Sequence, residues 1–232
     1  MKILARWCLA LLLLPFCFGA SSAFLLVLAA FKDVPENSFY FFMGMGSYFA
    51  FQWVFFRPLR TYVFGHELTH ALAAWMSGAR VSRFKVGKNG GFVSISKTNV
   101  FVALAPYFIP LYALLVFVLY AAVNHFYSLQ VYWRWTLWFI GVAVGFHAAL
   151  TAYALKQKQP DLKMAGTFLS GVLIYLGNMV LMSVLLALLF PKTASWNKFI
   201  RASARQTLWM TKKAWHGGST AWRKAGLTVK FE

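Results

Sequence analysis

The chain has 232 residues, of which 60% are hydrophobic and only five are acidic, against 23 lysines and arginines. This composition excludes an ordinary soluble domain. The formal net charge of +18 is carried by residues that flank long apolar runs. We therefore expect an integral, multi-pass membrane protein whose basic residues meet anionic lipid headgroups, with no nucleic-acid partner. Its compact, basic character indicates a bacterial or organellar membrane, and we expect a bacterial inner membrane.

Long apolar runs dominate the first four fifths of the chain. Five of them approach or exceed the roughly 20 residues that a bilayer crossing requires, and a shorter run, residues 62–76, follows the second. The sequence therefore predicts an all-α polytopic membrane domain over residues 1–191 with about six apolar helices. The long runs are residues 7–31, 38–56, 100–123, 133–155 and 165–190.

The shorter run contains His66, Glu67 and His70 in the pattern HExxH. Four residues apart on a helix, the two imidazoles lie on one face and can bind one cation. Imidazole suits Zn²⁺, and Glu67 can reach a water at the metal as a general base. We predict that His66 and His70 are zinc ligands and that Glu67 is catalytic. The alternative is a pair of core histidines beside a buried glutamate bonded to backbone.

A different pattern follows the motif. The stretch RVSRFKVGKNGGFVSISK alternates apolar and polar residues around Asn89, Gly90 and Gly91. Period-two strands joined by a glycine-rich turn predict a β-hairpin over about residues 79–98. An open sheet edge cannot face lipid, so we expect the hairpin at the membrane interface or against protein in a wet cavity.

A catalytic zinc site uses three protein ligands, so the motif needs a third. Four candidates exist: Asp161 in a loop between two apolar runs, His147 within a run, His125 in a loop, and His216 near the end of the chain. We favour Asp161, because a carboxylate neutralises metal charge and a loop beside a cavity can fold inward. His147 is the alternative third ligand, or else it orients the water or Asp161 from outside the ligand set.

Residues 192–232 form a basic tail in which lysine and arginine are interleaved with tryptophan. This pattern is typical of an amphipathic segment that lies along lipid headgroups, which we predict here; the alternative is a solvated, disordered tail. The basic residues are Lys192, Lys198, Arg201, Arg205, Lys212, Lys213, Arg223, Lys224 and Lys230.

Residues 60–180 resemble the M50 peptidases, the site-2-protease-like intramembrane zinc metalloproteases. The resemblance rests on GHELTHALAAW in a hydrophobic helix, GGFVSIS, LAPYFIPLYALL, and a later aspartate after proline in a loop before another apolar helix. That family holds zinc with the two motif histidines and a distant aspartate. The resemblance therefore implies His66, His70 and Asp161 as ligands, with Glu67 as the base.

Two positions depart from the family pattern, and one geometric problem remains open. Thr69 stands where the family commonly has glycine, and Leu162 stands after Asp161 in place of glycine. If every apolar run crossed the membrane, His66 and Asp161 would lie near opposite faces, although ligand bonds are only about 2 Å long. Either the motif helix does not cross and the hairpin returns the chain to its starting side, or His147 is the ligand. The short motif segment favours the first.

These features predict a membrane-embedded, zinc-dependent endopeptidase that cleaves membrane-protein substrates in or near the bilayer. The GGFVSIS strand is a candidate edge for pairing with an extended substrate. The alternative is a catalytically inactive membrane scaffold or interaction protein that retains a vestigial metal site. A transporter with a coupling metal is disfavoured, because acidic residues along a path are absent. The sequence gives no indication of the oligomeric state.

Overall fold

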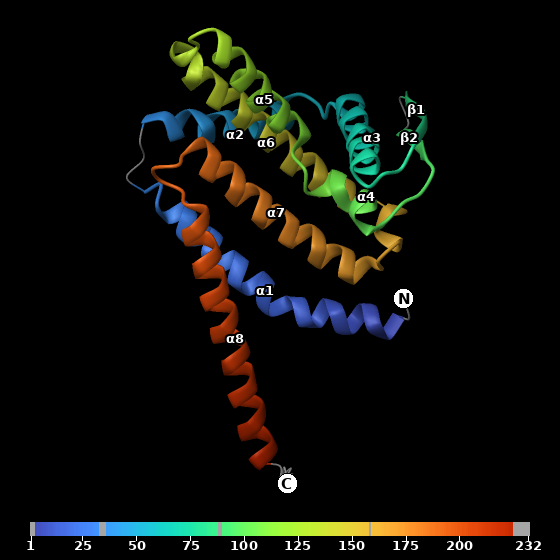
Figure 1. Cartoon of the computed structure of the whole chain (residues 1–232), viewed down its shortest axis with the longest axis vertical. Helices are drawn as coiled ribbons and strands as arrows, with labels where there is room; N and C mark the ends of the chain where they lie inside the picture. The colour runs from blue at the N-terminus through green and yellow to red at the C-terminus, as the bar shows by residue number, and fades with distance from the viewer. Residues whose placement is uncertain (1–2, 33–35, 88–89, 158, 225–232) are drawn as a thin grey trace.

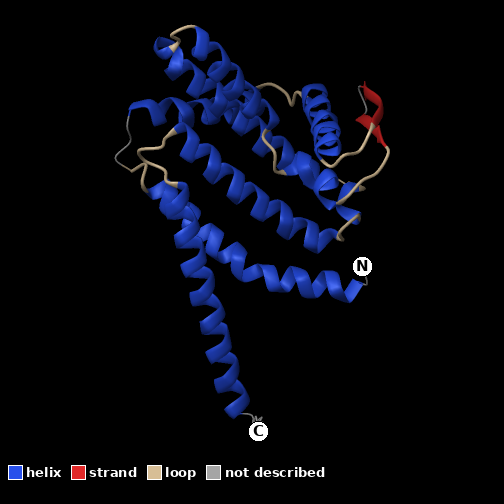
Figure 2. Ribbon diagram, in the orientation of Figure 1, coloured by secondary structure: helices blue, strands red, loops and turns tan. Residues whose placement is uncertain are grey.

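The structure is a computed structural model that describes residues 3–32, 36–87, 90–157 and 159–224. It is 77% helical, with eight α-helices and a small two-stranded sheet in the described residues (Figures 1 and 2). The helices are α1 (Ile3–Ala29), α2 (Glu36–Val54), α3 (Leu59–Met76), α4 (Val100–Leu104), α5 (Leu111–Phe126), α6 (Trp133–Leu155), α7 (Thr167–Leu189) and α8 (Trp196–Lys224).

Three helices in the described residues are long and apolar enough to cross a membrane: α1, α7, and α6 with the turn before it (Gln130–Leu155). A bent pair, Val100–Tyr107 and Leu111–Phe126, makes a fourth if it counts as one span. The predicted helical, apolar architecture is confirmed. By length and composition, however, three to four helices meet the requirement rather than about six.

The third predicted run, residues 100–123, is not one continuous helix. Its two parts, Val100–Tyr107 and Leu111–Phe126, are bent by 80° relative to each other. Pro110 directly precedes the second part, and proline has no amide hydrogen and clashes with the preceding helical turn. Just before the bend lies a short 3₁₀ turn, η1 (Ala105–Tyr107), which packs against α3.

Helix α2 belongs to the helical bundle although it falls outside the helices that meet the membrane-crossing requirement. Its backbone lies against α6, since a Cβ on Gly44 would overlap the carbonyl oxygen of Trp138. In the same way, a Cβ on Gly141 of α6 would overlap the carbonyl oxygen of Phe41. Small residues at such crossings are the usual means by which apolar helices approach closely in a membrane.

The predicted hairpin is confirmed, with strands β1 (Val81–Gly87) and β2 (Gly90–Ile95) in an antiparallel pair. The register places Phe84 opposite Val93. Asn89 of the predicted turn lies outside the described residues. Both strands pack against α3, so the hairpin covers one side of the motif helix (Figure 1).

The motif helix has a different direction from the long helices. In Figure 1, α1, α6 and α7 slant the same way, whereas α3 stands across them at the end of the bundle where α7 begins. The short 3₁₀ turn η3 (Asp161–Lys163) leads into α7 at that end. This arrangement brings the α6–α7 loop to α3.

Within the basic tail, Trp196–Lys224 form α8, which packs along α1, and Lys230 lies outside the described residues. Gly19 of α1 faces Thr207 closely, and the rings of Phe18 and Trp209 stack with centroids 6.1 Å apart. Phe199 is also buried. Part of the apolar face of α8 is therefore covered by protein, while Leu208 and Trp215 are exposed.

Candidate metal centre

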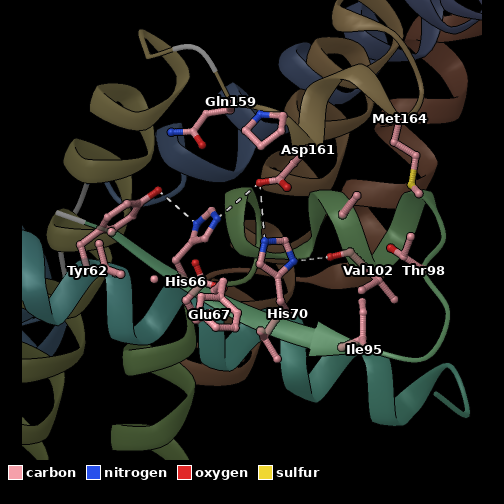
Figure 3. Close-up of a pocket in the computed structure, with 17 residues that line it drawn as sticks. Tyr62, His66, Glu67, His70, Ile95, Thr98, Val102, Gln159, Asp161 and Met164 are labelled. Carbon is pink, nitrogen blue, oxygen red and sulfur yellow. Dashed lines mark hydrogen bonds and ion pairs between the residues drawn. The ribbon is translucent and has the colours of Figure 1, made fainter. Parts of the chain in front are cut away.

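Helix α3 presents His66 and His70 on one face, one turn apart, with ring centroids 4.8 Å apart. From η3, Asp161 reaches both rings. Its Oδ2 atom lies 3.5 Å from Nε2 of His66 and 3.6 Å from Nε2 of His70 (Figure 3). Three potential ligand atoms from two distant segments of the chain therefore converge on one point.

The distances from Oδ2 of Asp161 to the two histidine nitrogens, 3.5 and 3.6 Å, are close to those between neighbouring ligand atoms around a small divalent cation. In a tetrahedral zinc site with bonds of 2.0–2.1 Å, neighbouring ligand atoms are about 3.3 Å apart. The ligand atoms of His66, His70 and Asp161 all lie within 4.8 Å of one another, and no other such group of His, Cys, Asp or Glu occurs in the described residues. Two nitrogens and one oxygen leave a fourth position for water or substrate, as catalytic zinc sites do.

The hydrogen bonds behind the site also favour a cation. Nδ1 of His70 lies 2.8 Å from the carbonyl oxygen of Val102. A carbonyl only accepts, so Nδ1 donates, and Nε2 is the nitrogen of His70 that can bind a metal once it carries no proton. A hydrogen bond from the other ring nitrogen is the usual way in which the orientation of a metal-binding imidazole is fixed. The second ring nitrogen of His66 lies 3.3 Å from the hydroxyl of Tyr62.

Tyr107 supports the carboxylate of Asp161 through a hydrogen bond. The sequence analysis did not identify this tyrosine as a site residue. Its hydroxyl donates to Oδ2 of Asp161 over 2.8 Å, and its carbonyl accepts from Nδ2 of Asn178. Burial alone would raise the pKa of Asp161, but the hydrogen bonds from His66, His70 and Tyr107 outweigh burial and hold that pKa well below its ordinary value. Asp161 is therefore a carboxylate, as a ligand must be.

Glu67 lies where the hairpin meets the motif helix, and it is only 8% exposed. A Cβ on Gly91 of β2 would lie 2.8 Å from Cγ of Glu67 and 2.9 Å from Val63. The absent side chain at Gly91 therefore lets the strand backbone close over Glu67. Burial raises the pKa of the Glu67 carboxyl, and the neighbouring His66 and His70 oppose that rise.

A cavity of about 640 Å³ opens in front of the three converging side chains. This volume is within the range of small-molecule and peptide-binding clefts. One wall is α3, with His66, Glu67 and His70, and another is the strand β2 from Gly90 to Val93. Gln159 and Met164 close the side formed by the α6–α7 loop (Figure 3).

The other three candidate ligands stand outside this cluster. His147 is buried in α6, its Nε2 has no hydrogen-bond partner in the described residues, and it lines a separate small cavity with Tyr62 and His66. His125 is exposed at the end of α5. The side chain of His216 lies outside the described residues.

Comparison of the chain with protein-family models, with curated proteins and with solved structures finds no match.

Proposed function

We propose that this chain is an integral membrane, zinc-dependent endopeptidase that cleaves membrane-protein substrates in or near the bilayer. The observation that carries the proposal is the convergence of His66, His70 and Asp161, with their ligand atoms within 4.8 Å of one another. Glu67 lies on the same helix as His66 and His70, and all four residues line the same cavity. Two nitrogens, one oxygen and an adjacent carboxylate are the components of a hydrolytic zinc site.

Each residue has a distinct task in the proposed reaction. Bound Zn²⁺ supplies Lewis acidity, which polarises the substrate carbonyl and lowers the pKa of the attacking water. Glu67 accepts a proton from that water as its oxygen bonds to the carbonyl carbon, and returns the proton to the amine nitrogen when the peptide C–N bond breaks. Val102 and Tyr107 fix the orientations of His70 and Asp161 through hydrogen bonds.

The cavity favours an extended polypeptide as the substrate. Strand β2 pairs with β1 on one side only, and its residues Gly91, Phe92 and Val93 line the cavity. A strand with one unpaired edge can hydrogen-bond an extended peptide, and the free backbone groups give affinity without demanding one sequence. A helical substrate segment satisfies its backbone hydrogen bonds internally, so it would have to unwind to pair with β2, and this pairing would hold the unwound segment near Glu67.

The zinc site is tested by the metal content of purified protein. His70→Ala removes one of the nitrogen ligands, so we expect bound zinc to fall from about one per chain to well below that value. The measurement is elemental analysis of full-length protein in detergent after dialysis. His125→Ala, at an exposed site on α5, is the matched control and should keep its zinc. Equal zinc in wild type and His70→Ala would show that the site does not exist.

We also propose that the basic tail binds the anionic membrane surface, which the mixture of basic and aromatic side chains on α8 supports. Lys212 and Lys213 are exposed, as are Trp209 and Trp215, and the ammonium of Lys213 lies 4.9 Å above the ring of Trp209. Tryptophan prefers the headgroup level, and each lysine near an anionic surface contributes roughly 1 kcal/mol.

Neutralising two of these lysines should weaken the attachment of the tail. For a peptide covering residues 192–230, we expect replacement of Lys212 and Lys213 by glutamine to lower partitioning into anionic vesicles about thirtyfold at low salt. Salt at 1 M should reduce the wild-type binding as well, because the Debye length falls to about 3 Å. Equal binding of the wild-type peptide to neutral and anionic vesicles would contradict the proposal.

A further inference from the structure

A second cavity, of about 200 Å³, lies between the first turns of α1 and α7. Its lining combines a cation, Arg6 of α1, with residues at the start of α7 and with apolar side chains. The residues at the start of α7 include Gly166 and Thr167, and the apolar side chains include Ile3, Trp7 and Phe168. It is separate from the metal centre, although Gly166 follows Asp161 by only a few residues in the chain.

Arg6 is the feature of this cavity that requires a partner. Its Nε atom is buried and has no hydrogen-bond partner in the described residues. The two acids whose side chains are described, Glu67 and Asp161, both line the cavity at the metal centre, so neither neutralises Arg6. A buried guanidinium Nε without an acceptor carries an uncompensated desolvation cost, and an anion in the cavity would reduce that cost.

The start of α7 adds donors next to the guanidinium. No side chain caps this helix at Gly166, and its first backbone bond runs from the amide of Ser170 to the carbonyl oxygen of Gly166. The preceding amides of the first turn therefore lack an intrahelical acceptor. Arg6 lies over this turn, since a Cβ on Gly166 would be 3.5 Å from its Cδ and 3.8 Å from its Nη1. Guanidinium and helix amides together suit the tetrahedral oxygens of a phosphate.

The apolar rim of the cavity favours the phosphate of a lipid over a free phosphate ion. Ile3 is 74% exposed and Trp7 is 53% exposed on a helix apolar enough to cross a membrane. The rings of Trp7 and Phe168 pack with centroids 5.0 Å apart beside the cavity. Aromatic and arginine side chains at the end of an apolar helix lie at the headgroup level of a bilayer. A phospholipid can place its phosphate on Arg6 and its glycerol and acyl carbons against this apolar rim.

We propose that the cavity formed by Arg6 and the first turn of α7 binds the phosphate of an anionic phospholipid. A free phosphate shares the same polar contacts but would leave the apolar rim in water. The proposal concerns a lipid site that is independent of the proposed peptidase reaction.

The test uses the full-length protein in detergent, with lipid binding measured by native mass spectrometry. Phosphatidylglycerol should bind saturably, and diacylglycerol with the same acyl chains, which lacks the phosphate, should not. Arg6→Met keeps the length of the side chain and removes the charge, so the affinity for phosphatidylglycerol should fall roughly tenfold or more. Arg83→Met makes the same change at an exposed position on β1 and should leave this high-affinity binding unchanged.

A second variant acts on the backbone donors. Thr167→Pro removes one amide hydrogen at the first position of α7, where proline is well tolerated. The ψ of 142° at Gly166 suits a residue before proline. This variant should fold and bind phosphatidylglycerol several-fold more weakly. If Arg6→Met fails to fold, Thr167→Pro decides the question.

Two outcomes would overturn the proposal. The first is unchanged binding of phosphatidylglycerol by the folded variants at Arg6 and Thr167. The second is binding of inorganic phosphate, lost in Arg6→Met, in a protein that retains no phosphatidylglycerol, because the ligand would then be free phosphate and the lipid assignment would be wrong.

Discussion

Glu67→Gln is expected to eliminate proteolysis while leaving zinc bound. Glutamine has nearly the volume of glutamate and keeps the contact with the hairpin at Gly91, but it cannot accept a proton from water. General-base catalysis contributes about 10²–10⁴-fold, so kcat/KM should fall by at least that factor. The measurement is cleavage of quenched-fluorescence peptides, each containing one transmembrane segment, by full-length protein in detergent, together with zinc analysis of the same samples.

The control for this experiment is Gln159→Ala, which alters the same cavity from the α6–α7 loop without removing a proton acceptor. Its rate should stay much closer to that of the wild type. Cleavage by Glu67→Gln at the wild-type rate would refute the assignment of the base. A wild-type protein that holds stoichiometric zinc and cleaves no peptide of the panel would instead favour the alternative function, a membrane scaffold with a vestigial metal site.

Three substitutions at and around the proposed zinc site should give a graded loss of zinc. Asp161→Ala removes a ligand and should abolish both stoichiometric zinc and proteolysis. Tyr107→Phe removes only the hydroxyl that donates to Asp161 over 2.8 Å, and loss of such a supporting hydrogen bond typically costs 10–100-fold in metal affinity. His147→Ala should lower activity and leave most of the zinc in place, because His147 lies outside the group of converging ligand atoms.

Zinc affinity in this series is measured by competition with a chelator, and folding is followed by circular dichroism. The order of the three variants is the decisive result. If His147→Ala lost its zinc while Asp161→Ala retained it, the third ligand would be His147, and the convergence of Asp161 on the motif would not reflect the metal-bound protein.

The sequence by itself determined the helices, the hairpin and the spacing of the motif histidines, because each of these depends on residues that are close together in the chain. Within a bilayer, a run of about 20 apolar residues favours a helix, because a backbone without water must satisfy its own hydrogen bonds. Period-two alternation around Gly90 and Gly91 predicted the hairpin, and β1 and β2 pair as expected. The four-residue spacing of His66 and His70 put both rings on one face of α3, which requires only the helical period.

The composition was a weaker guide to which apolar runs are straight spans. The run over residues 100–123 looked continuous, yet the chain bends by 80° at Pro110. Conversely, α2 does not meet the hydropathy requirement but packs closely on α6 through Gly44 and Gly141. The surrounding helices decide whether a proline bends a helix sharply and whether a glycine allows a neighbouring backbone to approach. The positions of those helices cannot be read from the sequence alone.

Only the tertiary structure decided which side chains meet at the motif. The sequence left Asp161 and His147 as alternatives, because the choice depends on whether α3 runs parallel to the long helices or across them. The structure sets α3 across the others at the end of the bundle where the α6–α7 loop lies, and Asp161 then reaches both imidazoles. The support from Tyr107 has the same origin, since it depends on the bend at Pro110 that packs η1 against α3. Contacts between segments far apart in sequence follow from helix packing, which no local period encodes.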